Sequence, residues 1–542
     1  MTTKLFDAII IGGGHNGLTT AGYLARKGLK VKVLEARHIV GGAAVTEEFY
    51  PGFRNSICSY TISLLHPKVI SDLELHKYGL TINLRDTASI SPLPDGRCLV
   101  QHKEADRFAA ELAQFSNRDS VTYPEFDARI SEVARALRDL TMTTPPNIGG
   151  GLPDLMRAIS AGNSMRKLSL TGQKELAKLM TMSVGDYLNS WFDGDAIKGS
   201  YGYVGVVGNM QSVYSAGTAY VLLHHAFGVV NGVEGAWGHA IGGMGAITQA
   251  MAKSAAAYGA DIEVSAPVKE VLVKNGRAVG VVTADGRRFE ARVIAANVNP
   301  KLLFGKLVDS AHVPADFKRE MDGWRCRSGS FRMNVALAEF PKFTCMRGRN
   351  LNEADFGSIV ISPSLDYAEH AFQDALKFGW SRKPIIEMWI PSVIDSTLAP
   401  PGQHVASLFC QHFDPYMAGK DWDDVREEAA DLVVDTLTEY APNFKNSVIG
   451  RQILSPKDLE RIFGLVGGDI FHGALHLDQI YSLRPAAGYA DYRMPIPGLY
   501  LCGSGAHPGG GVSGIPGHNA AREILKDLKP GPIAALRRAR AS

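Results

Sequence analysis

Short apolar runs that end at glycine-rich turns mark both ends of the chain. Residues 5–11 are mostly apolar and β-branched and stop at three glycines, which predicts a buried strand. Helical spacing of apolar residues over 17–27 predicts a helix, and the alternation over 30–35 predicts a second strand. Near the other end, the apolar run over 498–502 predicts one more buried strand, and a last helix is predicted over 514–528. The pattern indicates an α/β unit that uses both ends of the chain.

The middle of the chain alternates between helical and strand patterns. Residues 104–115 and 123–140 carry apolar side chains at helical spacing, and further helical pattern follows a Pro/Gly-rich loop. Strand patterns return from residue 262, with Asp285-Gly286 as a predicted hairpin turn, and a helix is predicted over 424–440. The strands that we expect in this half are 262–264, 267–274, 278–283, 287–294, 331–338, 358–362, 384–390 and 404–410.

One long stretch, residues 199–233, contains no Asp, Glu, Lys or Arg. Its length would permit a membrane helix, which needs about 20 apolar residues. However, His224 and His225 lie within it, and such polar groups are costly in lipid. We therefore interpret the stretch as the wall of an apolar cavity, with Tyr220 and Phe227 in contact with a substrate.

Composition and charge then narrow the class of protein. The chain has 542 residues, 45% hydrophobic and 21% charged, which is ordinary for a globular protein and excludes a disordered one. Its 57 Lys and Arg balance 55 Asp and Glu, so there is no electrostatic footprint for nucleic acid. No cleavable leader is recognisable, which predicts a cytoplasmic protein. The basic tail over 529–542 is a candidate for peripheral contact with anionic lipid.

The six cysteines are scattered singly along the chain. No C-x-x-C pair occurs, so neither a zinc knuckle nor a flavin–disulphide relay has its local signature. We therefore expect no metal site and a reducing compartment.

A glycine motif lies between the first predicted strand and helix. Gly12, Gly14 and Gly17 form G-x-G-x-x-G, in which the glycines permit a tight turn, close approach of a pyrophosphate, and helix–strand packing. The helix N-terminus then faces the phosphate charge. Glu35 ends the second strand, where an acid accepts a hydrogen bond from a ribose hydroxyl. The arrangement predicts a dinucleotide site.

Two further glycine-rich segments favour FAD over NAD. Gly41, Gly42 and Ala43 follow the acid closely, so the chain can fold back beside the pyrophosphate. Ser504 follows the last predicted strand and precedes the glycine-rich run that opens the final helix. That run also spells G-x-G-x-x-G, at 509–514, but no acid-ended strand follows it, so we expect one dinucleotide site.

These motifs resemble those of the FAD-dependent phytoene desaturase superfamily, within the wider class of amine oxidases and GDP-dissociation inhibitors. The similarity extends over about residues 6–528. It is greatest to the branch with O-type carotenoid ketolases and pyridine nucleotide-disulphide oxidoreductase domain-containing protein 2. The motifs that carry it are IIGGGHNGL (10–18), GGAAV (41–45), GGMGAI (242–247), APPGQH (399–404) and YLCGSGAHPGGGVSGIPGHN (500–519).

The resemblance implies which residues hold the FAD. Those implied for the ADP half are Gly12, Gly14, His15, Asn16, Gly17, Glu35, Ala36, Arg37, Gly42, Ala43 and Val268. Those implied beside the diphosphate, ribityl chain and flavin ring are Gly503, Ser504, Gly514, Ile515 and Gly517. Carotenoid members often carry threonine where this chain has Ala506, a departure that argues against a carotenoid substrate.

From these observations we expect an α/β flavoprotein of two domains. A Rossmann-like FAD-binding domain of the amine-oxidase and GDP-dissociation-inhibitor type, discontinuous in sequence, would use 1–85, 235–305 and 485–528, and an α+β substrate domain would use 86–234 and 306–484.

The expected reaction is hydride removal from a C–H bond of a lipophilic, isoprenoid or carotenoid-like substrate, with oxygen or a quinone as the electron acceptor. His507 is a candidate for a role beside the flavin ring or, alternatively, a histidine that shapes a turn. Two other functions stay open: an amine oxidase of the same fold, and a non-catalytic lipid- or prenyl-binding protein of the GDP-dissociation-inhibitor type.

Overall fold

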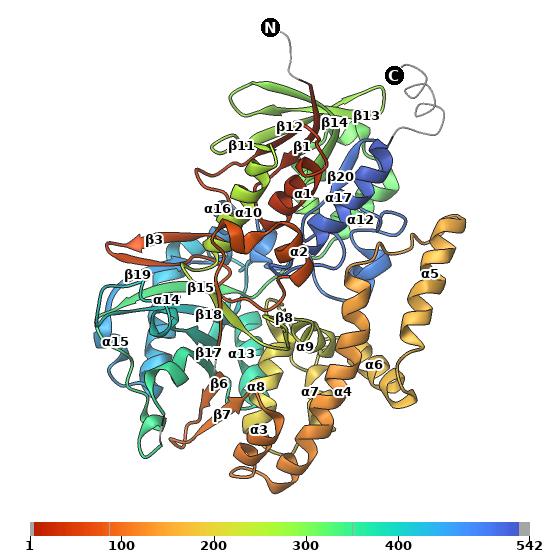
Figure 1. The fold of residues 1–542 in the computed structure, drawn as a ribbon. Coiled ribbons are helices and arrows are strands. Elements are labelled where there is room, and N and C mark those ends of the chain that lie inside the picture. Colours follow the sequence, from red (N-terminus) through yellow and green to blue (C-terminus); the bar gives the residue numbers. More distant parts are fainter. Residues whose placement is uncertain (1–4, 86, 350, 530–542) are drawn as a thin grey trace.

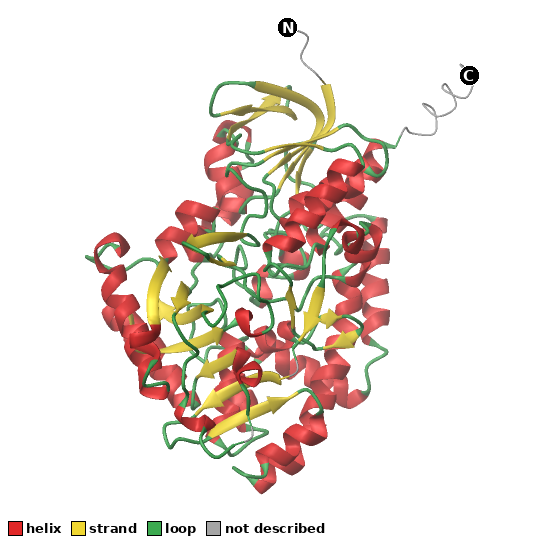
Figure 2. Ribbon diagram, turned by 60° about the vertical axis from the view of Figure 1, so that its left-hand side comes forward, coloured by secondary structure: helices red, strands yellow, loops and turns green. Residues whose placement is uncertain are grey.

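Two sheets organise the chain, and the computed structural model describes residues 5–85, 87–349 and 351–529. The first sheet lies at one end of the molecule, near both termini (Figure 1). The second sheet and a group of helices lie side by side at the other end, as the view in Figure 2 also shows. Within the described residues each sheet has seven strands.

The first sheet has a parallel centre that both ends of the chain build. Strand β1 pairs in parallel with β2 and with β14, and β14 pairs in parallel with the late strand β20. The ladder β14–β13–β12 is antiparallel and forms one edge. Helices α1 and α17 pack on one another beside this sheet, and α10 packs on α1. The bounds are β1 Leu5–Ile11, α1 His15–Ala25, β2 Val31–Leu34, α10 Gly245–Ala257, β11 Asp261–Glu263, β12 Val268–Lys274, β13 Arg277–Thr283, β14 Arg288–Ala296, β20 Leu499–Leu501 and α17 Ile515–Leu528.

The second sheet has the order β19-β15-β18-β17-β16-β6-β7. Its central strands are almost wholly buried, because helices α13 and α14 pack against β17 and the helical group covers further parts. The bounds are β6 Thr87–Pro92, β7 Cys98–His102, β15 Phe331–Leu337, β16 Ser358–Ile361, α13 Leu365–Phe378, β17 Trp380–Trp389, β18 His404–Phe413, α14 Trp422–Tyr440 and β19 Val448–Leu454.

The helical group comes from the segment between β7 and β10. The uncharged stretch 199–233 forms parts of two buried helices, α8 and α9, rather than one long helix. Helix α4 begins at Asn117, six residues before the predicted start, because the Ser116 hydroxyl caps it by accepting from the backbone N–H of Asp119 at 3.2 Å. The bounds are α3 Ala105–Leu112, α4 Asn117–Thr141, α5 Leu152–Met165, α6 Leu170–Thr181, α7 Val184–Asn189, α8 Asp195–Val206 and α9 Ala219–His225.

Shorter elements connect these layers. They are β3 Thr46–Tyr50, β4 Phe53–Ser56, α2 Pro67–Asp72, β5 Ile82–Leu84, β8 Val229–Val230, β9 Val233–Glu234, β10 Gly238–Ala240, α11 Pro300–Leu302, α12 Ala315–Gly323, α15 Phe444–Ser447 and α16 Pro456–Phe463. The boundaries of the FAD-binding domain and the substrate domain remain a proposal. In the described part of the chain no helix combines the length and the apolar character needed to cross a membrane.

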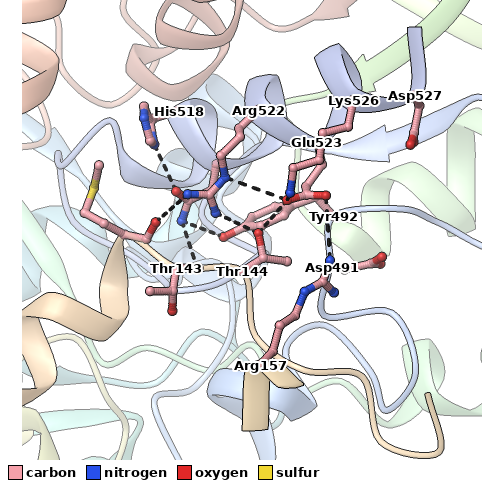
Figure 3. A network of polar contacts seen from close by, with 12 residues as sticks. Thr143, Thr144, Arg157, Asp491, Tyr492, His518, Arg522, Glu523, Lys526 and Asp527 are labelled. Atoms are coloured by element: carbon pink, nitrogen blue, oxygen red, sulfur yellow. Dashed lines mark hydrogen bonds and ion pairs between the residues drawn. The ribbon is translucent and has the colours of Figure 1, made fainter. Parts of the chain in front are cut away.

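A buried polar network fastens the helical group to α17 (Figure 3). Glu523 has no exposed surface, and its carboxylate accepts from the hydroxyl of Thr144 at 2.7 Å and pairs with Lys526 and Arg493 at 2.8 and 3.1 Å. Arg522 donates to the carbonyl of Met142 at 2.9 Å. Because removing one partner of a buried charge leaves the other unpaired, this joint fixes α17 against the end of α4.

Candidate functional site

The first glycine motif forms the turn between β1 and α1. Gly12 has a φ of +94°, and a Cβ at Gly17 would lie 2.1 Å from the carbonyl oxygen of Gly12, so neither position accepts a side chain. Gly14 is the N-cap of α1 and bridges to Gly41, and a Cβ at Gly42 would lie 3.3 Å from the Gly14 Cα. The two glycine segments therefore lie side by side, with backbone N–H groups at the helix start.

Glu35 holds this turn from the end of β2. Its Oε2 accepts from the backbone N–H of Gly13 at 2.7 Å, and its Oε1 accepts from the N–H of Arg37 at 2.8 Å. The side chain of Arg37 pairs with Glu47 at 2.7 Å, while its Nη1 is buried without a hydrogen-bond partner in the described structure. An unsatisfied buried donor is costly, so this site suits a ligand that brings acceptor oxygens.

The ends of β14 and β20 meet the same turn. Asn297, which directly follows β14, donates to the carbonyl of Gly12 at 3.2 Å, and a Cβ at Gly503 would lie 2.9 Å from its Oδ1. Asn16 donates to the hydroxyl of Ser504 at 3.2 Å. Fully buried Arg484 donates to the Ser504 carbonyl at 2.7 Å.

Sequence reasoning missed Asn297 and Arg484. The one available signal for Asn297 was a polar residue at the end of an apolar strand. Nothing local in the sequence marks Arg484, because its partners lie in loops brought together by the fold.

A cavity of about 760 Å³, here called the wide cavity, opens at this turn. Asn297 and Leu465 are part of its lining, together with most of the predicted cofactor residues. The predicted residues on its wall are Gly12, Gly14, His15, Glu35, Ala36, Arg37, Gly42, Ala43, Val268 and Ser504.

The other predicted cofactor residues support this wall without lining the wide cavity. Asn16 is buried with its Oδ1 unpartnered among the described residues, and Gly503 abuts Asn297. Gly514 is the N-cap of α17, and a Cβ at Gly517 would lie 2.2 Å from the Asn16 carbonyl oxygen, so this glycine lets α17 pack on α1. Ile515 is buried beside a different, smaller cavity.

A second cavity of about 460 Å³, the inner cavity, shares five lining residues with the wide cavity, and these residues are here called the junction. Two histidines stand at the junction, and burial lowers the pKa of His15 to about 4 and that of His472 to about 3, so both are neutral at pH 7. The residues that line both cavities are His15, Ala43, Leu465, His472 and Ser504.

One wall of the inner cavity is a face of the second sheet. The strand register places Val360, Glu387 and Phe409 opposite one another on β16, β17 and β18, and all three line the cavity. The Oε2 of Glu387 accepts from the hydroxyls of Tyr60 at 2.5 Å and Tyr203 at 2.6 Å. The sequence analysis missed this carboxylate, although a lone Glu in the apolar strand PIIEMWI was a usable signal.

Three residues predicted to touch the substrate or lie beside the flavin ring, Tyr220, Phe227 and His507, line neither of the two large cavities. Tyr220 is buried in the core and is not part of any of the three cavity walls described here, and Phe227 lines a small cavity of about 210 Å³. Helix α9 presents Leu222 and His225, rather than Tyr220, to the inner cavity, and Phe227 lies beyond the end of this helix. His507 lines none of these cavities; its Nε2 lies 3.2 Å from the carbonyl of Leu140, which fits the turn-shaping alternative.

All six cysteines are buried and free. Burial raises the pKa of Cys502 to about 12, so this thiol beside the glycine motif is inert at pH 7. No cluster of His, Cys, Asp or Glu with metal-binding geometry occurs among the residues that the structure describes.

Comparison with known proteins agrees with this architecture. The family model described as flavin containing amine oxidoreductase matches residues 17–525. The chain is 40% identical to pyridine nucleotide-disulfide oxidoreductase domain-containing protein 2 of Rattus norvegicus, over 97% of this chain and 94% of that protein. It is 27% identical to a limonene dehydrogenase subunit of Castellaniella defragrans, over 97% of this chain and 95% of that protein.

A solved structure of putrescine oxidase bound to putrescine matches 97% of this chain and 99% of that one, with a TM-score of 0.60 and 18% identity. That likeness shows the fold, and the expected fold class is confirmed. The family inferred from the sequence motifs is confirmed as well. The chain therefore belongs to the flavin containing amine oxidoreductases and is an oxidoreductase whose cofactor is FAD.

Proposed function

We propose that the wide cavity holds FAD and that the inner cavity holds a lipophilic substrate, from which hydride is removed at a C–H bond. The observation that carries the proposal is the junction of the two cavities at His15, Ala43, Leu465, His472 and Ser504. A cofactor bound along the glycine turn would present its reactive end where the substrate cavity begins.

The residues present fit FAD. Gly14 and Gly42 leave room for a pyrophosphate at the start of α1, whose N–H groups favour negative charge. Glu35 lines the cavity and keeps lone pairs for ribose hydroxyls, and Arg37 offers a buried Nη1 without a partner in the described structure. The predicted residues that line the wide cavity would contact the cofactor, and Asn16, Gly17, Gly503, Gly514, Ile515 and Gly517 would shape its cradle.

When bound, FAD supplies a two-electron acceptor for hydride. The protein contributes a cavity whose side chains would orient the C–H bond toward the junction. The Nε2–H of His15 donates to the carbonyl oxygen of Gly511 at 3.1 Å, which fixes the ring there. Because His15 and His472 are neutral, they add no positive charge that a hydrocarbon substrate would have to compensate.

Two observations support a lipophilic substrate. Much of the inner cavity is apolar, with Phe126, Val204, Leu222, Val360 and Phe409 among its lining residues. The relative from Castellaniella defragrans is named as part of a limonene dehydrogenase, and limonene is a hydrocarbon. An isoprenoid-like substrate that undergoes dehydrogenation fits both observations.

The test begins with the visible spectrum of the purified protein and continues with anaerobic reduction of the bound flavin. Incubation with isoprenoid hydrocarbons and alcohols should bleach the flavin band, whereas alkylamines should not. Bleaching by amines alone would favour an amine oxidase. A colourless protein that cannot be reconstituted with FAD would favour the non-catalytic binder.

We further propose that oxygen or a quinone accepts the electrons. Reoxidation of the reduced protein by air, compared with reoxidation by a soluble quinone under nitrogen, separates the two acceptors. A cytoplasmic location is also part of the proposal, and cell fractionation tests it.

Peripheral membrane contact is the last part of the proposal. The tail over 530–542 lies outside the described residues, but α5 supplies a candidate surface. Its exposed apolar residues recur at helical spacing, and exposed Arg166 and Lys167 follow at its end, a pattern typical of interfacial helices. These apolar residues are Leu152, Leu155, Met156 and Ile159. Flotation with anionic vesicles should capture the wild-type protein and lose a Leu155→Ser/Ile159→Ser variant.

A further inference from the structure

Among the charged side chains that line the inner cavity, Glu387 and Arg85 form a pair of opposite charges that the proposed hydride transfer does not use. Glu387 lies on β17, and Arg85 follows β5, more than three hundred residues away in sequence. Both line the inner cavity. Arg85 is only 5% exposed. Because removing a cation from solvent is costly, its presence here calls for an explanation.

Two contacts hold Arg85 in place beside Glu387. The Arg85 guanidinium stacks 3.8 Å above the ring of Trp389 and donates to the hydroxyl of Thr61. Trp389 and Glu387 are two residues apart on one strand, so their side chains leave the sheet on the same face. Arg85 therefore lies beside Glu387, and their opposite charges attract, which opposes the fall in the pKa of Arg85 that burial causes.

The carboxylate is only half satisfied. Both tyrosine hydroxyls, from Tyr60 and Tyr203, donate to the Oε2 of Glu387. Burial, followed by the charge of Glu387, raises the pKa of both phenols well above its ordinary value, so they remain protonated donors. No hydrogen bond reaches Oε1 from any described residue, although this oxygen belongs to a side chain on the cavity wall.

The guanidinium also keeps spare donors. Its Nη2 donates to Thr61, while its Nε is buried and has no partner among the described residues. The site thus presents an acceptor from Glu387 next to donors from Arg85. Within this pair the two charges cancel, so a ligand bound between Glu387 and Arg85 need bring no charge of its own.

We propose that this pair is a head-group site for a hydroxyl, which makes the substrate a lipophilic alcohol rather than a plain hydrocarbon, an amine or a carboxylate. A hydroxyl donates to Glu387 and accepts from Arg85 without changing the net charge. An ammonium could only donate, and a carboxylate could only accept, and each would leave one member of the pair unmatched. The inference rests on the proposed substrate role of the inner cavity.

Tyr60 connects this head-group site to the cavity junction. The preceding residue, Ser59, donates its backbone N–H to the carbonyl of Ala43 at 2.9 Å, and Ala43 lines both large cavities. The ring of Tyr60 stacks on Phe409 and lies 4.5 Å from the Arg332 guanidinium. A hydroxyl held here would therefore fix the position of the attached carbon chain relative to the junction.

Three matched probes test the inference: decan-1-ol, decylammonium and decanoate, titrated into the FAD-loaded protein and followed by calorimetry and by perturbation of the flavin spectrum. The wild-type protein should bind decan-1-ol at least about tenfold more tightly than either charged probe, because each charged probe leaves a buried polar group unpaired. Glu387→Gln and Arg85→Met should each weaken decan-1-ol by about tenfold while FAD content stays unchanged.

The control is Glu439→Gln, which removes an exposed carboxylate paired with Lys383 and should leave all three affinities unchanged. Tightest binding of decylammonium or decanoate in the wild type would overturn the hydroxyl assignment, as would equal affinity for all three probes. This ranking needs no variant, so it decides the matter even if a variant does not fold. If no probe binds to the FAD-loaded wild type, the proposed lipophilic substrate fails as well, which separates the two failures.

Discussion

The two large cavities share five lining residues but are constructed in opposite ways. One wall of the wide cavity is shaped by backbone, at the glycine turns that follow β1 and β2 within the first 43 residues, and its other walls come from later segments. The inner cavity is walled by side chains from β16, β17, β18 and helices α4, α8 and α9, which are distant in sequence. A backbone cradle demands particular residues at fixed spacing, whereas a side-chain cavity can change its chemistry one residue at a time.

Acid should unfold the protein and so abolish both cavities. In the unfolded chain a histidine binds a proton below about pH 6.5, whereas in the folded protein burial lowers the pKa of five histidines to between about 3 and about 4. The unfolded state therefore binds more protons in this window, and the free energy of unfolding falls as the pH drops through it. Each histidine contributes up to about 1.4 kcal/mol per pH unit. These histidines are His15, His224, His412, His472 and His507.

Asp469 is the carboxyl group that opposes this trend most strongly. Burial raises the pKa of Asp469 to about 7, so its protonation stabilises the fold as the pH falls from 7 toward 4. Five histidines should outweigh it. Thermal melting and flavin fluorescence, measured from pH 7.5 to 4, should show unfolding and FAD release together. A melting temperature that is constant over this range would refute the prediction.

Blocking the backbone cradle should empty the wide cavity alone. A Cβ at Gly14 would lie 2.9 Å from the amide nitrogen of Asn297, whose side chain can move, so Gly14→Val should fold. The added methyl groups would occupy the space of the pyrophosphate and weaken FAD by at least about 100-fold. The control is Gly162→Ala on α5, where a Cβ meets nothing within 4 Å. Normal flavin content in folded Gly14→Val would contradict the assignment.

Removing the acid at the end of β2 should have a smaller effect. Glu35→Ala should weaken FAD by about 1.5–3 kcal/mol, the usual value of a hydrogen bond to a charged group. Because Glu35 also holds the N–H groups of Gly13 and Arg37, the variant should melt earlier even without FAD. Comparison of apoprotein melting with FAD affinity separates the two roles. Lower melting with unchanged affinity would leave Glu35 as a support of the turn only.

Narrowing the inner cavity should have the smallest effect and should spare FAD. Val204 lines this cavity from α8, so Val204→Phe should weaken binding of decan-1-ol by roughly threefold to tenfold through lost space. Flavin content should stay normal. The matched control, Val121→Phe, lies on the surface of α4, where the valine is 82% exposed. Equal affinity in both variants would place the ligand elsewhere.

The sequence predicts more of the residues that line the wide cavity than of those that line the inner cavity, for a physical reason. Gly12, Gly14, Gly17 and Glu35 act within one strand–helix–strand unit, so their spacing alone encodes the turn. Glu387 meets Tyr60 only because β17 and the loop after β4 come together across 327 positions. No local sequence pattern indicates a contact between residues so far apart in the chain.

The uncharged stretch 199–233 illustrates both outcomes. Its lack of charge correctly indicated buried structure at a cavity. Its helical phase, which puts Leu222 rather than Tyr220 on the cavity wall, depends on how α9 packs. Helix ends were likewise predicted less accurately than the helices themselves. Helix α4, for example, begins six residues before its predicted start because Ser116 caps it.

The pairing of β1 with β14 means that the first strand is translated long before its partner. A ribosome adds about 5–20 residues per second, so β1 waits roughly 15 to 60 seconds for its partner to emerge. Helix α17, which Gly517 seats on α1, is translated later still. Until then β1 lacks its partner β14, and Asn16 lacks its contact with Ser504. If FAD binds in the wide cavity as proposed, its site is therefore complete only near the end of translation.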